Sequence, residues 1–239
     1  MTTGVSTVTT GNVARGSARR VKYGERGRDP YDALRFWSAA THGAGAAAAV
    51  VGTIWLLLRA RGGAAVAACA VYGLSMILLY TASGLYHRLR LAVRGRILLR
   101  KLDHASICLL IAGTYTPLCV LALNGVVGTA LLAAVWALAL GGVAMSVFWI
   151  GAPRWLSTAV YLVMGWMALF AIRPLYLSLN AAEFFWLLAG GVFYSLGGVL
   201  YALKWPGRYN PRFGCHEIFH LFVLAGSVCH YLMIRLIVL

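Results

Sequence analysis

Long apolar runs separated by short polar breaks make up most of the chain after residue 33. An α-helix needs about 20 apolar residues to cross the hydrocarbon core of a bilayer, and each run is about that long or longer. The seven runs are about Leu34–Leu58, Ala64–His87, Ile97–Leu123, Val126–Ile150, Leu156–Leu177, Phe184–Leu203 and His216–Leu239. Turn-forming pairs such as Asn124-Gly125 and Pro206-Gly207 separate them. The pattern predicts an all-α membrane protein in which residues 31–239 form a bundle of seven transmembrane helices.

The first 30 residues have a different composition. Residues 1–30 are rich in threonine, glycine and arginine and carry few apolar side chains, which predicts a disordered cytoplasmic tail. A secretory signal would place a short apolar core and a cleavage site soon after its positive charges. The run that begins at Leu34 is instead long enough to span a membrane, so we expect it to stay as the first helix.

The composition also excludes a soluble protein. Hydrophobic residues make up 61% of the chain and charged residues 11%, whereas soluble domains average about 45–50% and about 25%. The formal net charge of +15 would suggest a nucleic-acid partner in a soluble protein. Here basic residues do not alternate with aromatic ones on a water-facing element, so we expect no nucleic-acid partner. They cluster in the tail and in alternate loops, which predicts contact with anionic lipids of the inner leaflet.

The basic residues also predict the orientation of the bundle. If the N-terminus is cytoplasmic, all but four of the 21 lysines and arginines lie on the cytoplasmic side; the exceptions are Arg59, Arg61, Arg173 and Arg235. Cytoplasmic loops are enriched in such residues. We therefore predict a multi-pass protein of the plasma (inner) membrane with its N-terminus inside and its C-terminus outside.

The five cysteines do not form a disulfide framework. Their number is odd, none has CxxC spacing, and four lie inside apolar runs, which is typical of small buried hydrophobic residues. The fifth, Cys215, precedes His216 at the start of the last run, and a minor role near a metal stays open for it.

The candidate chemistry lies in the histidines, all of which fall in or at the end of a predicted span. His216 and His220 are one helical turn apart, so their imidazoles share a face with a spacing that suits two ligands of one zinc ion. His87 ends the second run, and Asp103 is expected one to two turns into the third helix. The topology puts all four residues in one layer near the inner leaflet.

This layer has the composition of a catalytic metal site. Three imidazoles with a fourth position left open are a known ligand set for catalytic zinc. A nearby carboxylate such as Asp103 can hold and deprotonate a water at the metal. We therefore predict a zinc site formed by His87, His216 and His220. Ser83 precedes His87 by one turn, and its hydroxyl either serves this site or bonds the carbonyl four residues earlier in its own helix.

The remaining polar residues in the spans have simpler explanations. For His42, His104 and His230 taken singly, we favour hydrogen bonds to backbone carbonyls or to each other between helices. Glu183 is expected in an external loop. Glu217 falls beside a span without an obvious solvent position, and an ionisable group at that depth is costly unless it is paired or ligated.

At these residues the chain resembles the hemolysin III family, the bacterial branch of the progestin and adipoQ receptor group that also includes adiponectin receptors. The resemblance extends from about residue 33 to the C-terminus. The segments that carry it are Thr41-His42-Gly43, Ser83-Gly84-Leu85-Tyr86-His87, Leu102-Asp103-His104, Gly113-Thr114-Tyr115-Thr116-Pro117, His216-Glu217-Ile218-Phe219-His220, Gly226-Ser227 and His230-Tyr231. Each motif alone is modest, but their order and their places at the helix ends are specific.

The resemblance implies a seven-helix fold with its N-terminus inside and a zinc site near the inner leaflet. It implies His87, His216 and His220 as ligands, Asp103 in contact with the water at the zinc, and Ser83 just outside the ligands. Because the wider superfamily includes alkaline ceramidases, it also implies hydrolysis of a ceramide-like lipid amide. The family name implies lysis of red cells, which the sequence does not explain.

Three functions remain open at this point. The first is a zinc-dependent lipid hydrolase with Asp103 as general base and Ser83 as an auxiliary group. The second is an intramembrane metalloprotease, because residues 216–220 also match the HExxH pattern of zincins, with Glu217 as the base. The third is a non-enzymatic membrane sensor or a cytolytic, pore-forming protein in which zinc is structural.

The orientation can be tested with topology reporters. Because the positive charges lie mostly on one side, a reporter fused after Leu239 should be active only outside the cytoplasm, and one inserted near Arg94 only inside. The reverse result would contradict the expectation that the histidines lie near the inner leaflet.

Overall fold

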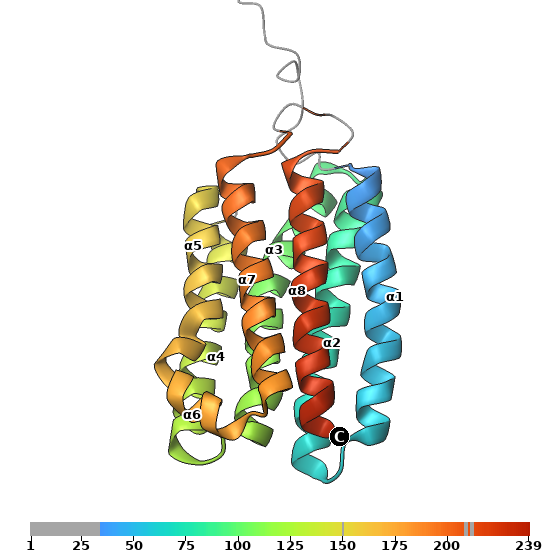
Figure 1. The fold of residues 1–239 in the computed structure, drawn as a ribbon. Helices are drawn as coiled ribbons and strands as arrows, with labels where there is room; N and C mark the ends of the chain where they lie inside the picture. The colour runs from blue at the N-terminus through green and yellow to red at the C-terminus, as the bar shows by residue number, and fades with distance from the viewer. Residues whose placement is uncertain (1–33, 150, 208–209, 211–212) are drawn as a thin grey trace, which may run out of the picture.

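The computed structural model describes residues 34–149, 151–207, 210 and 213–239. Over these residues it contains seven helical spans that are long and apolar enough to cross a membrane. They stand side by side as a bundle (Figure 1). The all-α, seven-helix prediction is confirmed. The predicted tail, residues 1–30, lies outside the described residues, and the side of the membrane that each end faces stays a prediction.

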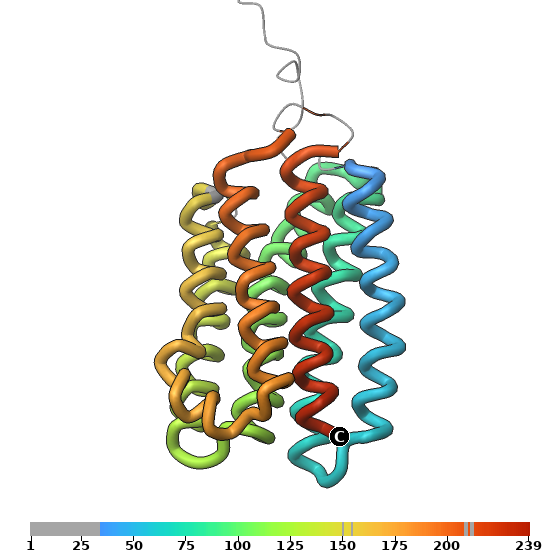
Figure 2. Tube along the Cα trace, in the orientation of Figure 1, coloured from blue at the N-terminus to red at the C-terminus, as the bar shows by residue number. Residues whose placement is uncertain are grey.

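The spans follow the predicted runs closely. The elements are α1 (Phe36–Arg59), α2 (Gly63–Arg88), α3 (Val93–Pro117), η1 (Leu118–Ala122), α4 (Gly125–Phe148), α5 (Arg154–Gly165), η2 (Trp166–Ala171), α6 (Ile172–Ser178), α7 (Ala181–Leu203) and α8 (Cys215–Val238). Consecutive helices α1 to α4 pack against one another, α7 packs against α8, and α8 packs back against α1. As a result α1 and α8 begin at the same end of the bundle, where α2 ends (Figure 2).

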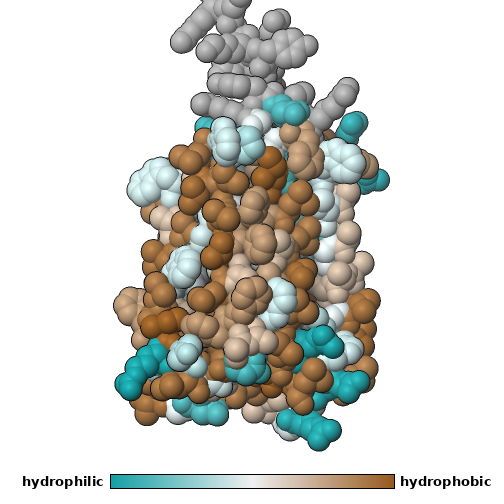
Figure 3. All heavy atoms as spheres, in the orientation of Figure 1, coloured by the Kyte–Doolittle hydropathy of each residue, from teal (hydrophilic) through white to brown (hydrophobic). Residues whose placement is uncertain are grey.

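The outer surface has the character of a lipid-facing protein. Large apolar side chains are exposed along the helices, for example Leu58 at 79%, Val126 at 86% and Phe170 at 88%. Hydrophobic residues cover the middle of the visible face, with hydrophilic side chains gathered towards the two ends (Figure 3). Lipid solvates such a surface, whereas the helices satisfy their backbone hydrogen bonds internally.

Two spans depart from regular α-helix next to a proline. Pro117 ends α3, and the span continues as the π-helical segment η1. The fifth span contains the 3₁₀ segment η2 between α5 and α6, with Pro174 in α6. Proline lacks an N–H group, and its ring clashes with the carbonyl four residues earlier, which accounts for the 3₁₀ turn before Pro174. The apolar runs alone predicted uninterrupted spans.

The structure corrects two predicted positions. Helix α3 begins at Val93, so Asp103 lies nearly three turns from its start and not one to two. The helix extends beyond the apolar run because arginine is a good helix former whose long side chain reaches a polar phase. Glu183 is in the first turn of α7 and not in a loop: its carboxylate accepts from the Asn180 N–H at 2.8 Å, while Asn180 Oδ1 accepts from the Glu183 N–H at 3.0 Å. The two residues form a capping box.

Gly128 allows the connection before α4 to fold back onto that helix. A Cβ atom at Gly128 would overlap the backbone carbonyl of Leu123, whereas a Cβ at Gly141 in the same helix would meet nothing within 4 Å. Because a backbone atom cannot rotate away, Gly128→Ala should destabilise the protein by about 1–3 kcal/mol. Thermal unfolding in detergent measures the change, with Gly141→Ala as the control. Equal unfolding temperatures for the two variants would contradict this account of the turn.

Candidate metal centre

Three histidines from two helices converge where α2 ends and α8 begins. His87 is in the last turn of α2, and His216 and His220 are in the first two turns of α8. The Nε2 atom of His216 lies 3.1 Å from Nε2 of His87 and 3.1 Å from Nε2 of His220. The candidate ligand atoms of the three residues all lie within 4.8 Å of one another. The structure thus brings together the three residues that the sequence singled out.

The spacing of these nitrogen atoms fits a metal ion. Zinc binds imidazole nitrogen at about 2.0–2.1 Å, which puts the nitrogens of a tetrahedral site about 3.3 Å apart. A ring nitrogen either donates or accepts, so His216 Nε2 cannot share a separate proton with both neighbours. One cation among three lone pairs would satisfy all of them. The donor set, neutral nitrogen only, is one that zinc accepts readily.

The start of α8 is fixed by the residue between the two histidines. Glu217 is the third residue of the helix, and its Oε2 accepts a hydrogen bond from the Gly214 N–H at 2.8 Å. This contact satisfies one of the backbone groups that a helix leaves unpaired at its first turn. It also fixes where the helix begins, and therefore which way His216 and His220 project.

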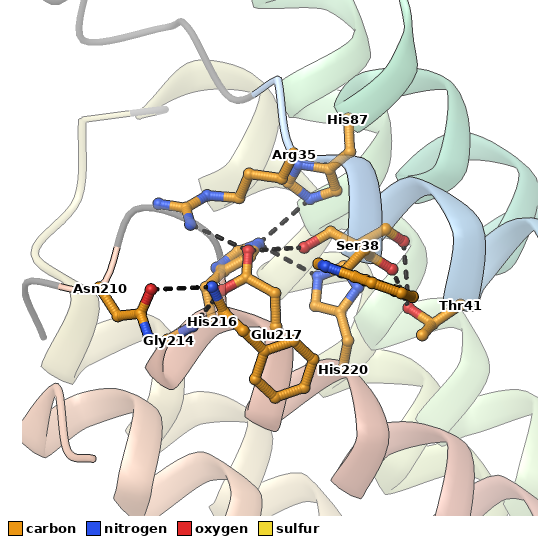
Figure 4. A network of polar contacts seen from close by, with 11 residues as sticks. Arg35, Ser38, Thr41, His87, Asn210, Gly214, His216, Glu217 and His220 are labelled. Carbon is orange, nitrogen blue, oxygen red and sulfur yellow. Dashed lines mark hydrogen bonds and ion pairs between the residues drawn. The ribbon is translucent and has the colours of Figure 1, made fainter. Parts of the chain in front are cut away.

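The second oxygen of Glu217 binds α1. Glu217 Oε1 accepts from Arg35 Nη1 at 2.9 Å and from the Ser38 hydroxyl at 3.3 Å. The carboxylate is 2% exposed and the Arg35 side chain 28%. The backbone N–H of Arg35 donates to the His87 carbonyl at 3.1 Å. Figure 4 shows these contacts beside the histidine cluster. Arg35 therefore joins the two helices that carry the histidines.

Asp103 and Ser83 form a second polar pair in the same region. Both are buried, Asp103 on α3 and Ser83 on α2, and the Ser83 hydroxyl is hydrogen-bonded to the Asp103 carboxylate. This contact joins α2 to α3. Both residues line the same cavity as the three histidines.

That cavity has a volume of about 290 Å³ and extends inside the bundle away from the histidines. Apolar side chains from three helices form much of its wall, including Leu110, Leu187 and Val223. On α8 the lining continues from His216 to His230, a distance of about 21 Å at 1.5 Å per residue. The cavity is therefore long and mostly apolar, with Asp103 and the three candidate ligands towards one end and His230 towards the other.

We expected simple hydrogen bonds for His42, His104 and His230, and the structure gives these three histidines different contacts. His230 Nε2 lies 3.2 Å from the Leu187 carbonyl, which confirms the expectation for that residue. His104 also lines the cavity, and Tyr161 donates to its backbone carbonyl at 3.4 Å. The ring of His42 stacks on that of His220, a contact between α1 and α8 that the sequence did not predict.

Two residues at the site were not singled out from the sequence. The sequence marks Arg35 only as one of the cytoplasmic charges, and none of its motifs includes Ser38. A signal was available, because Arg35, Ser38 and His42 are spaced i, i+3 and i+7, which puts three polar side chains on one face of the first span. The cysteines are all free, and Cys215, the first residue of α8, is the partly exposed one.

Fold and site together define a multi-pass membrane protein with a histidine cluster at one end of a seven-helix bundle. Comparison with known proteins gives the family: residues 34–231 match the one described as haemolysin-III related, and the chain belongs to it. This membership and the seven apolar helices identify it as a multi-pass protein of the plasma membrane.

The relatives agree with this assignment. The chain is 41% identical over 206 residues to Hemolysin-3 of Bacillus cereus, covering 84% of this chain and 90% of that protein. It is 39% identical over 197 residues to the Hemolysin-3 homolog of Bacillus subtilis (strain 168), covering 81% and 89%. A shorter match, 40% over 58 residues, joins it to the adiponectin receptor protein of Drosophila melanogaster, covering 22% and 13%. No solved structure gives a significant match.

Proposed function

We propose that this protein is a zinc-dependent hydrolase of a lipid amide, with ceramide-like lipids as the substrate class. His87, His216 and His220 hold the zinc. The observation that carries the proposal is the convergence of three imidazoles at one end of a long apolar cavity that Asp103 and Ser83 also line. A site of this kind joins a metal and a carboxylate to a space suited to an apolar chain.

The reaction needs a polarised carbonyl and a proton acceptor. Zinc, when bound, supplies a Lewis acid that polarises the amide carbonyl and makes water more acidic. Asp103 accepts the proton of the attacking water and later donates it to the departing amine, so that one water and one amide give a fatty acid and an amine. Ser83 donates its hydroxyl proton to the carboxylate and keeps Asp103 turned towards the cavity.

The shape of the cavity supports a lipid rather than a peptide substrate. Its wall beyond the histidines is formed largely by side chains such as Leu110 and Val223, which offer few hydrogen bonds to a polypeptide backbone. An extended peptide carries a donor and an acceptor at every residue, and each one left unpaired in an apolar cavity is costly. An acyl chain has no such groups.

The contacts of Glu217 argue against the protease. In an HExxH protease the glutamate between the histidines is the general base and must reach the attacking water. Here one oxygen of Glu217 accepts from Gly214 N–H and the other from Arg35 and Ser38. A carboxylate held by an ion pair and a backbone amide on its two oxygens is a poor base, so Asp103 is the better candidate.

A second candidate function comes from the names of the relatives. Two proteins that share about 40% of their residues with this chain over most of its length are called Hemolysin-3 and its homolog. If membrane lysis is the activity, the histidine cluster holds a structural metal and the purified protein lyses erythrocytes without hydrolysing lipid. The lysis assay therefore belongs beside the amidase assay.

Anionic lipids are proposed as partners of the connection between α2 and α3. Arg88, Arg90 and Arg94 are exposed there, next to exposed Leu89 and Leu91. Basic side chains near a headgroup layer attract anionic lipids, and apolar neighbours enter the interface beside them.

Replacing a proposed ligand should remove the metal. His87→Ala, His216→Ala and His220→Ala should each lower zinc affinity at least about 10- to 100-fold, because each loses a nitrogen ligand. Elemental analysis and chelator competition on purified protein provide the measurement. His230→Gln is the matched control, since His230 is also a partly buried histidine of α8 but contacts the Leu187 carbonyl. Full zinc content in the His87→Ala protein would exclude α2 from the site.

Two carboxylate variants should separate the candidate reactions. Asp103→Asn should keep zinc and lower hydrolysis of a ceramide-like amide by about 100-fold or more, because an amide cannot take the proton. Glu217→Gln breaks the ion pair with Arg35 and should lower zinc affinity by up to about tenfold, but at saturating zinc it should keep most of the activity, since general-base catalysis is not lost. Hydrolysis is followed by fatty acid release, and zinc content is measured on the same samples. A Glu217→Gln protein that binds zinc but has no activity would favour the protease, and a parent protein without turnover would favour the non-enzymatic function.

A further inference from the structure

Helix α1 contributes none of the three candidate ligands, yet it touches the residues around them at three points. We infer that one face of α1, formed by Arg35, Ser38 and His42, positions the imidazoles that hold the metal, with His42 acting directly on His220. The inference rests on the proposed zinc site and adds residues to it for which the family match names no role. These three residues are called the α1 face below.

The α1 face lies at the start of the helix. Ser38 and His42 are one turn apart on the same side of α1, and Arg35 is the N-cap residue directly before the helix. Ser38 is 0% exposed and His42 3%. Helix α1 packs against α8, and two polar residues of this lipid-embedded helix, Ser38 and His42, turn inwards towards the start of α8. Polar side chains at this depth are costly and are retained where they do something specific.

His42 acts on the site through the face of its ring. Its imidazole stacks on that of His220, with ring centroids 3.7 Å apart and an interplanar angle of 23°. The group of residues whose nitrogens come close enough to share a metal consists of His87, His216 and His220, without His42. The stacked ring therefore supports His220 by fixing its plane.

A second aromatic ring, that of Tyr80, contacts His42. The Tyr80 ring of α2 meets the imidazole of His42 edge-on, with centroids 5.1 Å apart at 84°. The Tyr80 hydroxyl donates to Ser227 at 2.5 Å, and Tyr194 Oη lies 2.7 Å from the same Ser227 oxygen. The chain of contacts thus runs from α7 through α8 and α2 to α1. With one neighbour fixed by hydrogen bonds, His42 has little freedom to tilt, and neither has His220.

The backbone allows this close approach one turn further along α1. A Cβ atom at Gly45 would lie 2.8 Å from Leu224 Cδ2 and 3.0 Å from Tyr80 Cδ1. A side chain at this position would require Leu224 or Tyr80 to move, so glycine favours the close approach of α1 to both α2 and α8. The separation that Gly45 permits is what brings the rings of His42 and His220 into van der Waals contact.

Arg35 performs the corresponding task for the other two ligands. Its backbone N–H holds the His87 carbonyl at 3.1 Å, and its guanidinium holds Glu217, the neighbour of His216, at 2.9 Å. One residue therefore fixes the end of α2 relative to the start of α8. Groups that orient metal ligands from outside in this way typically change metal affinity about 10- to 100-fold when they are removed.

The test for His42 uses variants that separate its ring from its nitrogens. His42→Ala removes the stacked ring and should lower zinc affinity about tenfold or more, whereas His42→Phe keeps a flat ring and should stay within about threefold of the parent. Thr53→Val is the matched control, because Thr53 is also buried on α1 but bonds the Ala49 carbonyl of its own helix. Affinity is measured by chelator competition on the purified full-length chain. The visible spectrum of the cobalt-substituted protein reports ligand geometry independently of activity.

Variants of Arg35 provide an independent test of the same inference. Arg35→Ala should lower zinc affinity about tenfold and change the cobalt spectrum, and Arg35→Lys, which keeps a charge for Glu217, should recover most of the loss. Thermal unfolding of the metal-free proteins identifies variants that fail to fold, and these are excluded from the comparison. If His42→Ala is excluded, the zinc affinity of His42→Phe, which fills a similar volume, decides whether a flat ring at this position is sufficient.

The outcomes distinguish this inference from the proposed function. If the parent protein binds no zinc, the proposed site itself is wrong and the inference falls with it. If the parent binds zinc and folded His42→Ala binds it equally well with an unchanged cobalt spectrum, the site stands and the role of the α1 face is overturned. Equal losses in His42→Ala and His42→Phe would also overturn it, because stacking would then not be the operative contact.

Discussion

The structure at the histidine end of the bundle depends on one buried carboxylate. Glu217 is almost completely removed from solvent, and a charge in that position must be neutralised and hydrogen-bonded or the helices cannot pack around it. Arg35 provides the charge, and Ser38 and the Gly214 amide provide the hydrogen bonds. Because these partners come from α1 and from the segment before α8, satisfying the carboxylate brings both elements to the end of α2. The arrangement of His87, His216 and His220 follows from that assembly.

This arrangement divides the work of the site among helices that are distant in sequence. Ligand candidates come from α2 and α8, the carboxylate Asp103 from α3, and the surrounding support from α1. Each helix contributes near the same end of the bundle, while the apolar cavity uses the remaining length of α3, α7 and α8. The polar chemistry and the apolar binding space are therefore separated along the membrane normal.

The parts that sequence predicted well are those with a strong local signal. Seven apolar runs specify seven spans, and the i, i+4 pair His216 and His220 with His87 at a helix end specifies the cluster. Features that depend on how two helices face each other were not predictable in the same way. The stacking of His42 on His220 requires the register of α1 against α8, and the bond of Ser83 to Asp103 requires that of α2 against α3. The starts of α3 and α7 were misplaced because basic and capping residues extend a helix beyond its apolar run.

The position of Glu217 in the first turn of its helix has a consequence for how short sequence patterns are interpreted. In a five-residue pattern the glutamate between two histidines looks the same wherever the helix begins. When the pattern opens the helix, that glutamate is the third residue, and the free amide before the helix captures it. When the pattern lies deeper in a helix, the amides around it are already paired and the carboxylate is free to turn towards a substrate. The distance from HExxH to the helix start is therefore a structural criterion that pattern searches lack. Inserting one helical turn before Cys215 would move Glu217 away from the helix start and release its carboxylate from the amide that precedes the helix.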